Sequence, residues 1–267
     1  AICASVQNRT LSQMLKRQMT QHIISRHAVY FMAEMRRHRI QLDVITYNAA
    51  VSACAKGEEW QQALGLFAEM CHNGLEPDLF THNSAISACA TGEQWQRALW
   101  LWVEMSKCSL KPDVISYNAA MSACEKGGQW ERALVLLAAL REYRLEPTVI
   151  SYSSTISACE KGQQWEWSLC ILGEMQGFAV EPEIFCYSAA IKACSNGEQW
   201  QRALGMLMAM RDSALEPNVI SYSAAISACD ASEHWEHALS LLVEMRSCDL
   251  EPNLISYSAA ISACSKR

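Results

Sequence analysis

The sequence lacks several features that would indicate an enzyme or a membrane protein. None of its apolar runs approaches the roughly 18 residues that a membrane span requires. It has no glycine-rich phosphate loop, no H-E-x-x-H pair and no G-x-S-x-G elbow, and none of its 13 cysteines forms a C-x-x-C pair. We therefore expect no membrane partner, no catalytic activity, no cofactor or metal, and no small-molecule substrate.

Charge is also scarce and is unevenly balanced. Charged residues make up 19% of the chain and apolar residues 51%, a ratio typical of a folded protein rather than a disordered one. Acidic residues exceed basic ones, which gives a net charge of −6. A net negative charge disfavours nucleic acid unless the cations gather on one face.

What the sequence does contain is a repeat of 35 residues. Tryptophan, proline and an aromatic residue each recur at this interval. The series are Trp60, Trp95, Trp130, Trp165, Trp200 and Trp235; Pro77, Pro112, Pro147, Pro182, Pro217 and Pro252; and Tyr47, His82, Tyr117, Tyr152, Tyr187, Tyr222 and Tyr257.

These series divide the whole chain into repeats. We predict six complete repeats over residues 44–253, namely 44–78, 79–113, 114–148, 149–183, 184–218 and 219–253, and a truncated seventh at 254–267. Residues 1–43 are predicted to be a degenerate capping repeat, since 9–43 keep only Met35, Ile40 and Asp43 in register. The chain begins without an initiator methionine, and we expect it to be a fragment or a processed form.

Each repeat carries two helical stripes. Tyr47, Ala50, Val51 and Cys54 lie at i, i+3, i+4 and i+7, which is the spacing of one apolar helix face. Gly57 is expected to end this helix, a second stripe starts at Trp60, and Asp78 is a suitable N-cap for the next repeat. A single helical hairpin cannot bury both stripes, so the hairpins must stack. The fold class is therefore all-α, an α-solenoid that we expect to form a right-handed superhelix.

Two recurring residue types have competing interpretations. One cysteine per repeat has no partner within its repeat, so we interpret Cys54 and its counterparts as small buried hydrophobes rather than disulfide partners. The tryptophans could stack on bases, but each lies on the apolar stripe of the second helix, which favours packing between hairpins. Met70 and its counterparts are interpreted as packing residues too.

Three local signatures resemble one known family. These are V-I-T-Y-N at the start of the repeat, A-L-x-L-F-x-E-M in its second helix and G-L-x-P-D at its end. Together with the period they are similar to the pentatricopeptide repeat (PPR) family over about residues 9–267, with a P-type array of 35-residue repeats. The resemblance implies sequence-specific binding of single-stranded RNA, one base per repeat, in organellar RNA processing, stability or translation.

The resemblance also assigns base-reading pairs, each made of the residue after the tyrosine and the last residue of the repeat. Carried onto this sequence they are Asn48 with Asp78, Asn83 with Asp113, Asn118 with Thr148, Ser153 with Glu183, Ser188 with Asn218, and Ser223 with Asn253, and Ser258 lacks its partner. Asn with Asp resembles a uridine reader and Ser with Asn an adenine reader. The Asn–Thr and Ser–Glu pairs depart from the common combinations, so the implied order is 5′-UU-pyrimidine-purine-AA-3′ with its two central bases open.

Two further residue sets follow from the resemblance. An apolar side chain near the start of each first helix sandwiches the base: Ile45, Phe80, Ile115, Ile150, Phe185, Ile220 and Ile255. A basic residue at the end of the first helix faces the phosphates: Lys56, Lys126, Lys161 and Lys266. Thr91, Asn196 and Ala231 interrupt this series, which predicts modest affinity.

Simpler roles remain open for the same residues. Asp, Asn and Thr at the end of a repeat are good N-caps without any ligand, although Glu183 is a poor one. A lysine at a helix C-terminus suits the helix dipole. A protein-binding helical scaffold is the alternative function, since protein effectors are possible partners and the net charge fits it. Localisation to plastid or mitochondrion is implied by the family alone.

Overall fold

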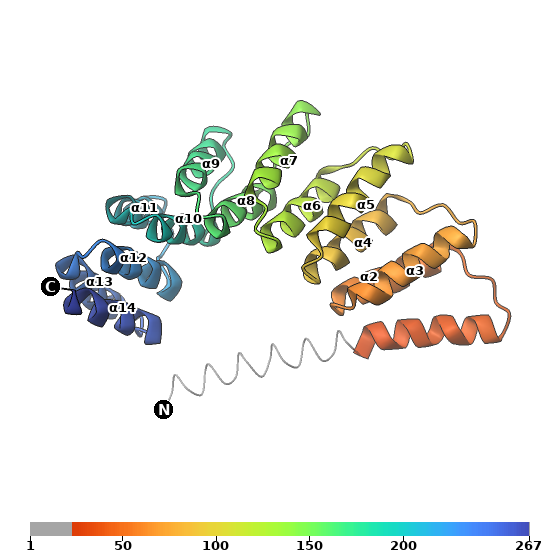
Figure 1. Ribbon diagram of the computed structural model, residues 1–267, viewed down its shortest axis with the longest axis horizontal. Coiled ribbons are helices and arrows are strands. Elements are labelled where there is room, and N and C mark those ends of the chain that lie inside the picture. Colours follow the sequence, from red (N-terminus) through yellow and green to blue (C-terminus); the bar gives the residue numbers. More distant parts are fainter. Residues whose placement is uncertain (1–22, 267) are drawn as a thin grey trace. The chain divides into compact units, whose positions relative to one another are not determined.

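The computed structural model describes residues 23–266, and this part of the chain is helical throughout (Figure 1). Residues 23–37 of the predicted capping repeat form a helix. Residues 1–22 of that repeat lie outside the described residues. The helices that follow are α2 (Val44–Lys56), α3 (Trp60–His72), α4 (Leu79–Thr91), α5 (Trp95–Lys107), α6 (Val114–Lys126), α7 (Trp130–Glu142), α8 (Val149–Lys161), α9 (Trp165–Gly177), α10 (Ile184–Asn196), α11 (Trp200–Asp212), α12 (Val219–Ala231), α13 (Trp235–Ser247) and α14 (Leu254–Ser265). None of these helices combines the length and the apolar character needed to cross a membrane.

The chain divides into two compact units, Ala1–Gly127 and Gly128–Arg267. In the first unit the even-numbered helices α2, α4 and α6 pack on one another in succession. In the second unit α8, α10, α12 and α14 do the same. In the first unit α3 packs on α2 and α4, and α5 packs on α4 and α6; in the second unit α9, α11 and α13 likewise pack on the first helices before and after them. Within each unit the backbones of successive second helices are not in contact in the described residues. Each unit is therefore a stack of hairpins, as the predicted solenoid requires, with the first helices forming one continuous layer.

Side-chain caps start the first helices. Asp43, Asp78 and Asp113 each accept a hydrogen bond from the backbone N–H three residues later, at 2.8–2.9 Å. Asn218 and Asn253 cap α12 and α14 in the same way, at 3.0 and 2.9 Å. These bonds satisfy backbone donors that the first turn of a helix leaves free.

The first helices bury the residues predicted from their stripes. The recurring cysteines from Cys54 to Cys229 are fully buried, and burial raises the pKa of Cys159 to about 12. Their interpretation as buried apolar residues is confirmed, except that Cys264 in the last helix is exposed. Met70 and its counterparts in the second helices are also fully buried.

The tryptophans pack between hairpins, which confirms the packing interpretation. Trp60 is partly buried and lies against Gly92, the residue that ends the first helix of the next hairpin. The same contact recurs between Trp95 and Gly127, and between Trp165 and Gly197. A Cβ atom at Gly92 would lie 2.1 Å from Trp60 Cδ1, so glycine is required there by close approach.

The glycine that ends α2 has an ordinary backbone conformation. Gly57 does cap α2, but its φ is −84°, so it does not adopt the left-handed conformation. The positive φ, 60°, occurs one residue later at Glu58. The helix ends where predicted, and the positive φ is adopted by a residue other than glycine.

Candidate functional site

Three of the predicted reading pairs are in hydrogen-bond contact. Asn48 Nδ2 donates to Asp78 Oδ2 at 2.9 Å. Asn83 Nδ2 donates to Asp113 Oδ1 at 3.3 Å, and Ser223 Oγ donates to Asn253 Oδ1 at 3.4 Å. These residues are 30 positions apart in sequence, and they meet because the end of one repeat is the N-cap of the next first helix.

The other pairs differ. Ser188 Oγ lies 2.9 Å from Ser221 Oγ, and it has no hydrogen bond to Asn218 within the described residues. Ser153 Oγ donates to the Ile150 carbonyl at 3.2 Å and forms no hydrogen bond with Glu183 in the part of the chain that the structure describes.

The remaining predicted positions are Asn118, Thr148 and Ser258. Asn118 belongs to the first compact unit and Thr148 to the second. Ser258 is exposed in the last helix.

One carboxylate can cap a helix and hold a reading residue. Asp78 Oδ1 accepts from Thr81 N at 2.8 Å and lies 2.8 Å from Thr81 Oγ1, while Oδ2 accepts from Asn48. Burial alone would raise the pKa of Asp78, but these hydrogen bonds outweigh it and leave the pKa below its usual value. Asp113 has a lowered pKa from the same balance. Both side chains are therefore held as carboxylates that accept hydrogen bonds and do not donate them. Glu183 makes no side-chain capping bond, as expected for a poor cap.

The predicted sandwiching residues are all exposed, although they are large and apolar. Each is the second residue of a first helix, and other apolar residues of the same helices, such as Val51 and Ile86, are fully buried. The exposed fractions are 76% for Ile45, 54% for Phe80, 63% for Ile115, 59% for Ile150, 55% for Phe185, 62% for Ile220 and 60% for Ile255. Core packing does not account for such a series. We refer to these seven residues as the apolar ladder.

The predicted phosphate-facing lysines are exposed but differ in their partners. Lys56 and Lys126 form no ion pair within residues 23–266. Lys266 Nζ lies 3.0 Å from Asp230 Oδ1, and Lys192 pairs with Glu160 at the same distance. The first-helix layer is therefore less basic than its lysine content suggests, because neighbouring repeats neutralise part of it.

The sequence interpretation missed the third residue of each first helix. Thr81 Oγ1 donates to Asn48 Oδ1, and Ser223 Oγ lies 2.8 Å from Ser256 Oγ. A signal was present, since Thr or Ser recurs at 46, 81, 116, 151, 221 and 256, with Cys186 as the exception. It was overlooked because a serine or threonine near a helix start is explained by capping alone.

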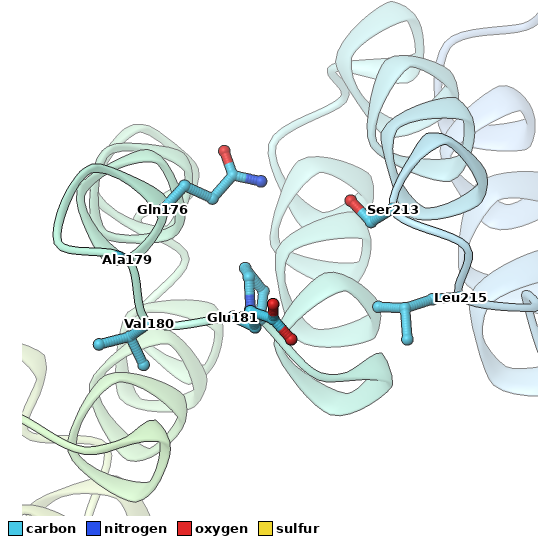
Figure 2. A pocket seen from close by; sticks show the side chains of 7 residues that line it. Gln176, Ala179, Val180, Glu181, Ser213 and Leu215 are labelled. Carbon is cyan, nitrogen blue, oxygen red and sulfur yellow. The ribbon is translucent and has the colours of Figure 1, made fainter.

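A surface hollow of about 340 Å³ lies where the loop before α10 faces the end of α11 (Figure 2). Gln176 Nε2 donates to the Tyr187 hydroxyl at 2.9 Å, and that hydroxyl lies 3.0 Å from Ser213 Oγ. A similar hollow recurs one repeat later, beside Leu215 and Leu250. Both belong to the spacing between successive hairpins, and the polar groups named here are joined to one another rather than directed at a ligand.

Family models match the chain along most of the repeat array. The PPR repeat family model matches residues 42–91 and 112–161, and the pentatricopeptide repeat domain model matches 170–231. A single PPR repeat model matches 80–110 and 220–250. No curated protein matches the chain.

Solved structures share the fold at low sequence identity. The crystal structure of the pentatricopeptide repeat protein PPR10 from maize is 23% identical, with a TM-score of 0.65, over 91% of this chain and 36% of that one. PPR10 in complex with an 18-nucleotide psaJ RNA element is 17% identical, with a TM-score of 0.59, over 91% of this chain and 40% of that one. The PPR domain of Arabidopsis thaliana protein-only RNase P 1, in complex with tRNA, is 12% identical, with a TM-score of 0.59, over 67% of this chain and 95% of that one.

This chain thus spans little more than a third of the length of PPR10. The period, the local signatures, the stacked hairpins and the matching family models agree. The chain belongs to the pentatricopeptide repeat family.

Proposed function

We propose that this chain binds single-stranded RNA sequence-specifically, one base per repeat, and acts as a non-enzymatic adaptor in organellar RNA processing, stability or translation. Two of the structures that share its fold are complexes with RNA. The observation that carries the proposal is the apolar ladder, because one large apolar side chain stays exposed in each repeat beside a polar pair.

The geometry suits a base held flat between successive ladder residues. A base has two apolar faces and a polar edge, so apolar contacts above and below leave the edge free for hydrogen bonds. Ile45 and Phe80 would enclose the base whose edge faces Asn48 and Asp78. Stacking on side chains contributes about 1–3 kcal/mol per base, so six repeats supply useful affinity after the cost of ordering the strand.

The proposed order of bases is 5′-UU-pyrimidine-purine-AA-3′, with its two central bases open and the 5′ end at the N-terminal repeats. Asn48 and Asn83 present amides that can both donate and accept at a uridine edge. Ser188 and Ser223 are shorter and are buried at 7% and 5% exposure, which leaves room above them for an adenine.

Lysines on the first-helix layer would neutralise phosphates. With about four such contacts, the slope of log affinity against log salt for a single strand is expected near −3. The pairing of Lys266 with Asp230 predicts a somewhat shallower slope.

Fluorescence anisotropy with labelled RNA tests the proposal. The probe carries the proposed six bases with C and A at the centre, and the control strand has the same composition with its uridines and adenines exchanged. We expect the probe to bind at least about tenfold more tightly, and the variant Asn48→Ser/Asn83→Ser to lose its preference at the first two bases while keeping the helical circular dichroism of the wild type. Equal affinity for both strands, or an unchanged preference in the variant, would contradict base reading.

A protein-binding scaffold is the second candidate, and exposed apolar side chains on the second helices favour it. Trp100 on α5, Val135 on α7 and Val243 on α13 are 58%, 67% and 68% exposed. The net charge of −6 also suits a protein partner. Failure to bind either RNA strand, together with retained folding, would support this candidate.

A further inference from the structure

We propose that the hydroxyl group on the third residue of each first helix is the positioning group that makes base reading selective. We further propose that the fourth reading pair, where Cys186 replaces this hydroxyl, holds a base without discriminating among the four. We call these residues the N3 hydroxyls; they are Thr46, Thr81, Ser116, Ser151, Ser221 and Ser256. The inference rests on the proposed function and adds to it the group that orients the reading side chain.

In the first pair the N3 hydroxyl sets which way the Asn48 amide faces. Asp78 is a carboxylate, so only the NH2 group of Asn48 can face it, and that bond is 2.9 Å long. On the other side Thr81 Oγ1, which is fully buried, donates to Asn48 Oδ1. A flipped amide would place its oxygen against a carboxylate and its nitrogen against a hydroxyl. The amide therefore presents one fixed pattern of donors, as selection of one base requires.

In the serine pairs the N3 hydroxyl sets the direction of another hydroxyl. Ser221 Oγ donates to Asn218 Oδ1 at 3.1 Å, so toward Ser188, 2.9 Å away, it offers a lone pair. Ser188 must then donate inward, which leaves its own lone pairs for a donor on the ligand. Ser256 has the same relation to Asn253, at 2.9 Å, and lies 2.8 Å from Ser223; the hydroxyl of Ser223 also reaches the Val219 carbonyl of its own helix, at 2.6 Å, so its orientation is shared between two acceptors. An outward-facing acceptor suits the exocyclic amino group of adenine.

The fourth pair, Ser153 with Glu183, has no N3 hydroxyl. Cys186 is fully buried, and a thiol is only a weak hydrogen-bond donor and acceptor. Ser153 contacts neither Cys186 nor Glu183 within the described residues, and its hydroxyl turns back to the Ile150 carbonyl of its own helix. The apolar ladder is nevertheless intact here, since Ile150 and Phe185 are 59% and 55% exposed. This repeat thus keeps the surfaces that stack on a base and lacks the group that orients the reader.

In the second pair, Asn83 with Asp113, the reading amide is held less firmly than in the first pair. Ser116 Oγ lies 2.8 Å from Asp113 Oδ1, but it has no bond to Asn83, whose Oδ1 is buried without a partner. The amide is then held on one side only, by the 3.3 Å bond to Asp113. We expect discrimination at the second base to be weaker than at the first and stronger than at the fourth.

Binding titrations with single-base variants of the probe test this. For the wild-type chain we expect a wrong first base to weaken binding about five- to tenfold, as one net hydrogen bond to the correct base implies, and all four bases at the fourth position to bind within about twofold. Thr81→Val should reduce discrimination at the first base to within about twofold while changing affinity for the uridine probe less than about threefold. Thr81→Ser should restore discrimination.

Thr46→Val is the matched control, since it removes the hydroxyl that Asp43 binds at 2.6 Å in α2 but touches none of the six reading pairs. Thr46→Val should lose about the same stability from capping as Thr81→Val does, and it should leave selectivity for the first base unchanged. Loss of first-base selectivity in Thr46→Val would show that the effect is only structural and would overturn the proposal.

The fourth pair allows a gain of selectivity to be measured. Glu183→Asn with Cys186→Ser builds the arrangement seen at Ser188, Asn218 and Ser221, and should create a preference for adenine of about fivefold at the fourth base. Glu183→Asn alone should create a much smaller preference for adenine. If that single change gives the full preference, or if Thr81→Val keeps its selectivity, the positioning role is refuted and RNA binding itself still stands. A wild-type chain without any preference at the first base refutes both.

Discussion

The contact between Trp60 and Gly92 gives the sharpest stability prediction. Gly92 has φ −84° and ψ 10°, a conformation that alanine adopts without strain. By chain entropy alone, Gly92→Ala would stabilise the protein by about 0.4–1 kcal/mol. The added Cβ, however, would lie 2.1 Å from Trp60 Cδ1 and 2.5 Å from Cγ, closer than non-bonded carbon atoms approach.

The entropic gain and the steric clash oppose each other, and the clash should be the larger effect. Trp60 is confined because it lies between hairpins and because Arg97 sits over its ring at 4.8 Å. Overpacking of this kind costs about 1–3 kcal/mol. We therefore expect Gly92→Ala to lower the free energy of unfolding by about 1.3 kcal/mol, the difference between the central values of the two effects.

The matched control is Gly65→Ala in the middle of α3. A Cβ atom at Gly65 would meet nothing within 4 Å, so only the helix propensity and entropy terms act. This change should raise stability by about 0.5–1 kcal/mol. Urea unfolding followed by circular dichroism should thus show opposite shifts of the midpoint for the two variants.

A double variant isolates the cause. If the ring is responsible, Gly92→Ala should cost little in a Trp60→Ala background, because alanine lacks the Cδ1 and Cγ atoms that the new methyl group would meet at 2.1 and 2.5 Å. The reasoning fails if Gly92→Ala stabilises the protein as Gly65→Ala does, or if its cost is the same in both backgrounds.

Three further predictions concern reactivity, pH and salt. Burial raises the pKa of Cys159 to about 12, so this thiol should not react with a thiol reagent at pH 8 in the folded protein, whereas exposed Cys71 should react at once. Equal reaction rates for the two thiols, measured by absorbance, would contradict the burial of Cys159. Since the folded-state pKa of Asp78 lies below its unfolded value near 3.8, its stabilising effect is present above that pH and is lost as the pH falls through the lower folded value. Unfolding measured from pH 6 to pH 3 should therefore show a smaller loss of stability for Asp78→Asn than for the wild type. Lys126→Ala should make the salt slope of RNA binding shallower by about 0.7, whereas Lys107→Ala, on a second helix, should leave it unchanged.

The 35-residue period was sufficient to predict the helices. Helix starts at Trp60 and Leu79 and helix ends at Lys56 and Thr91 follow from capping residues, apolar spacing and the position of proline, all of which act over a few residues. The same local logic predicted buried cysteines and methionines. It did not show that Gly92 makes room for Trp60, because that contact lies between neighbouring repeats.

The candidate site was predictable in part. The family resemblance named the apolar ladder and the reading pairs, and the exposure of Ile45 and the bond between Asn48 and Asp78 agree with those assignments. That these residues read bases stays a prediction. The bond from Thr81 to Asn48 was not foreseen, because residues 33 positions apart come together only when one hairpin stacks on the next.

The sequence by itself therefore determined the repeat, its helices and the residues that each helix buries, since these depend on local spacing and on the hydrophobic effect. Only the tertiary structure decided which polar groups meet between repeats. It showed that Lys266 is held by Asp230, that Gly92 makes room for Trp60, and that Ser188 and Ser223 each face a hydroxyl of the next repeat whereas Ser153 bonds to its own helix. The physical reason is that hydrogen bonds and close contacts depend on distances of a few tenths of an ångström, which stacking sets and a sequence pattern does not contain.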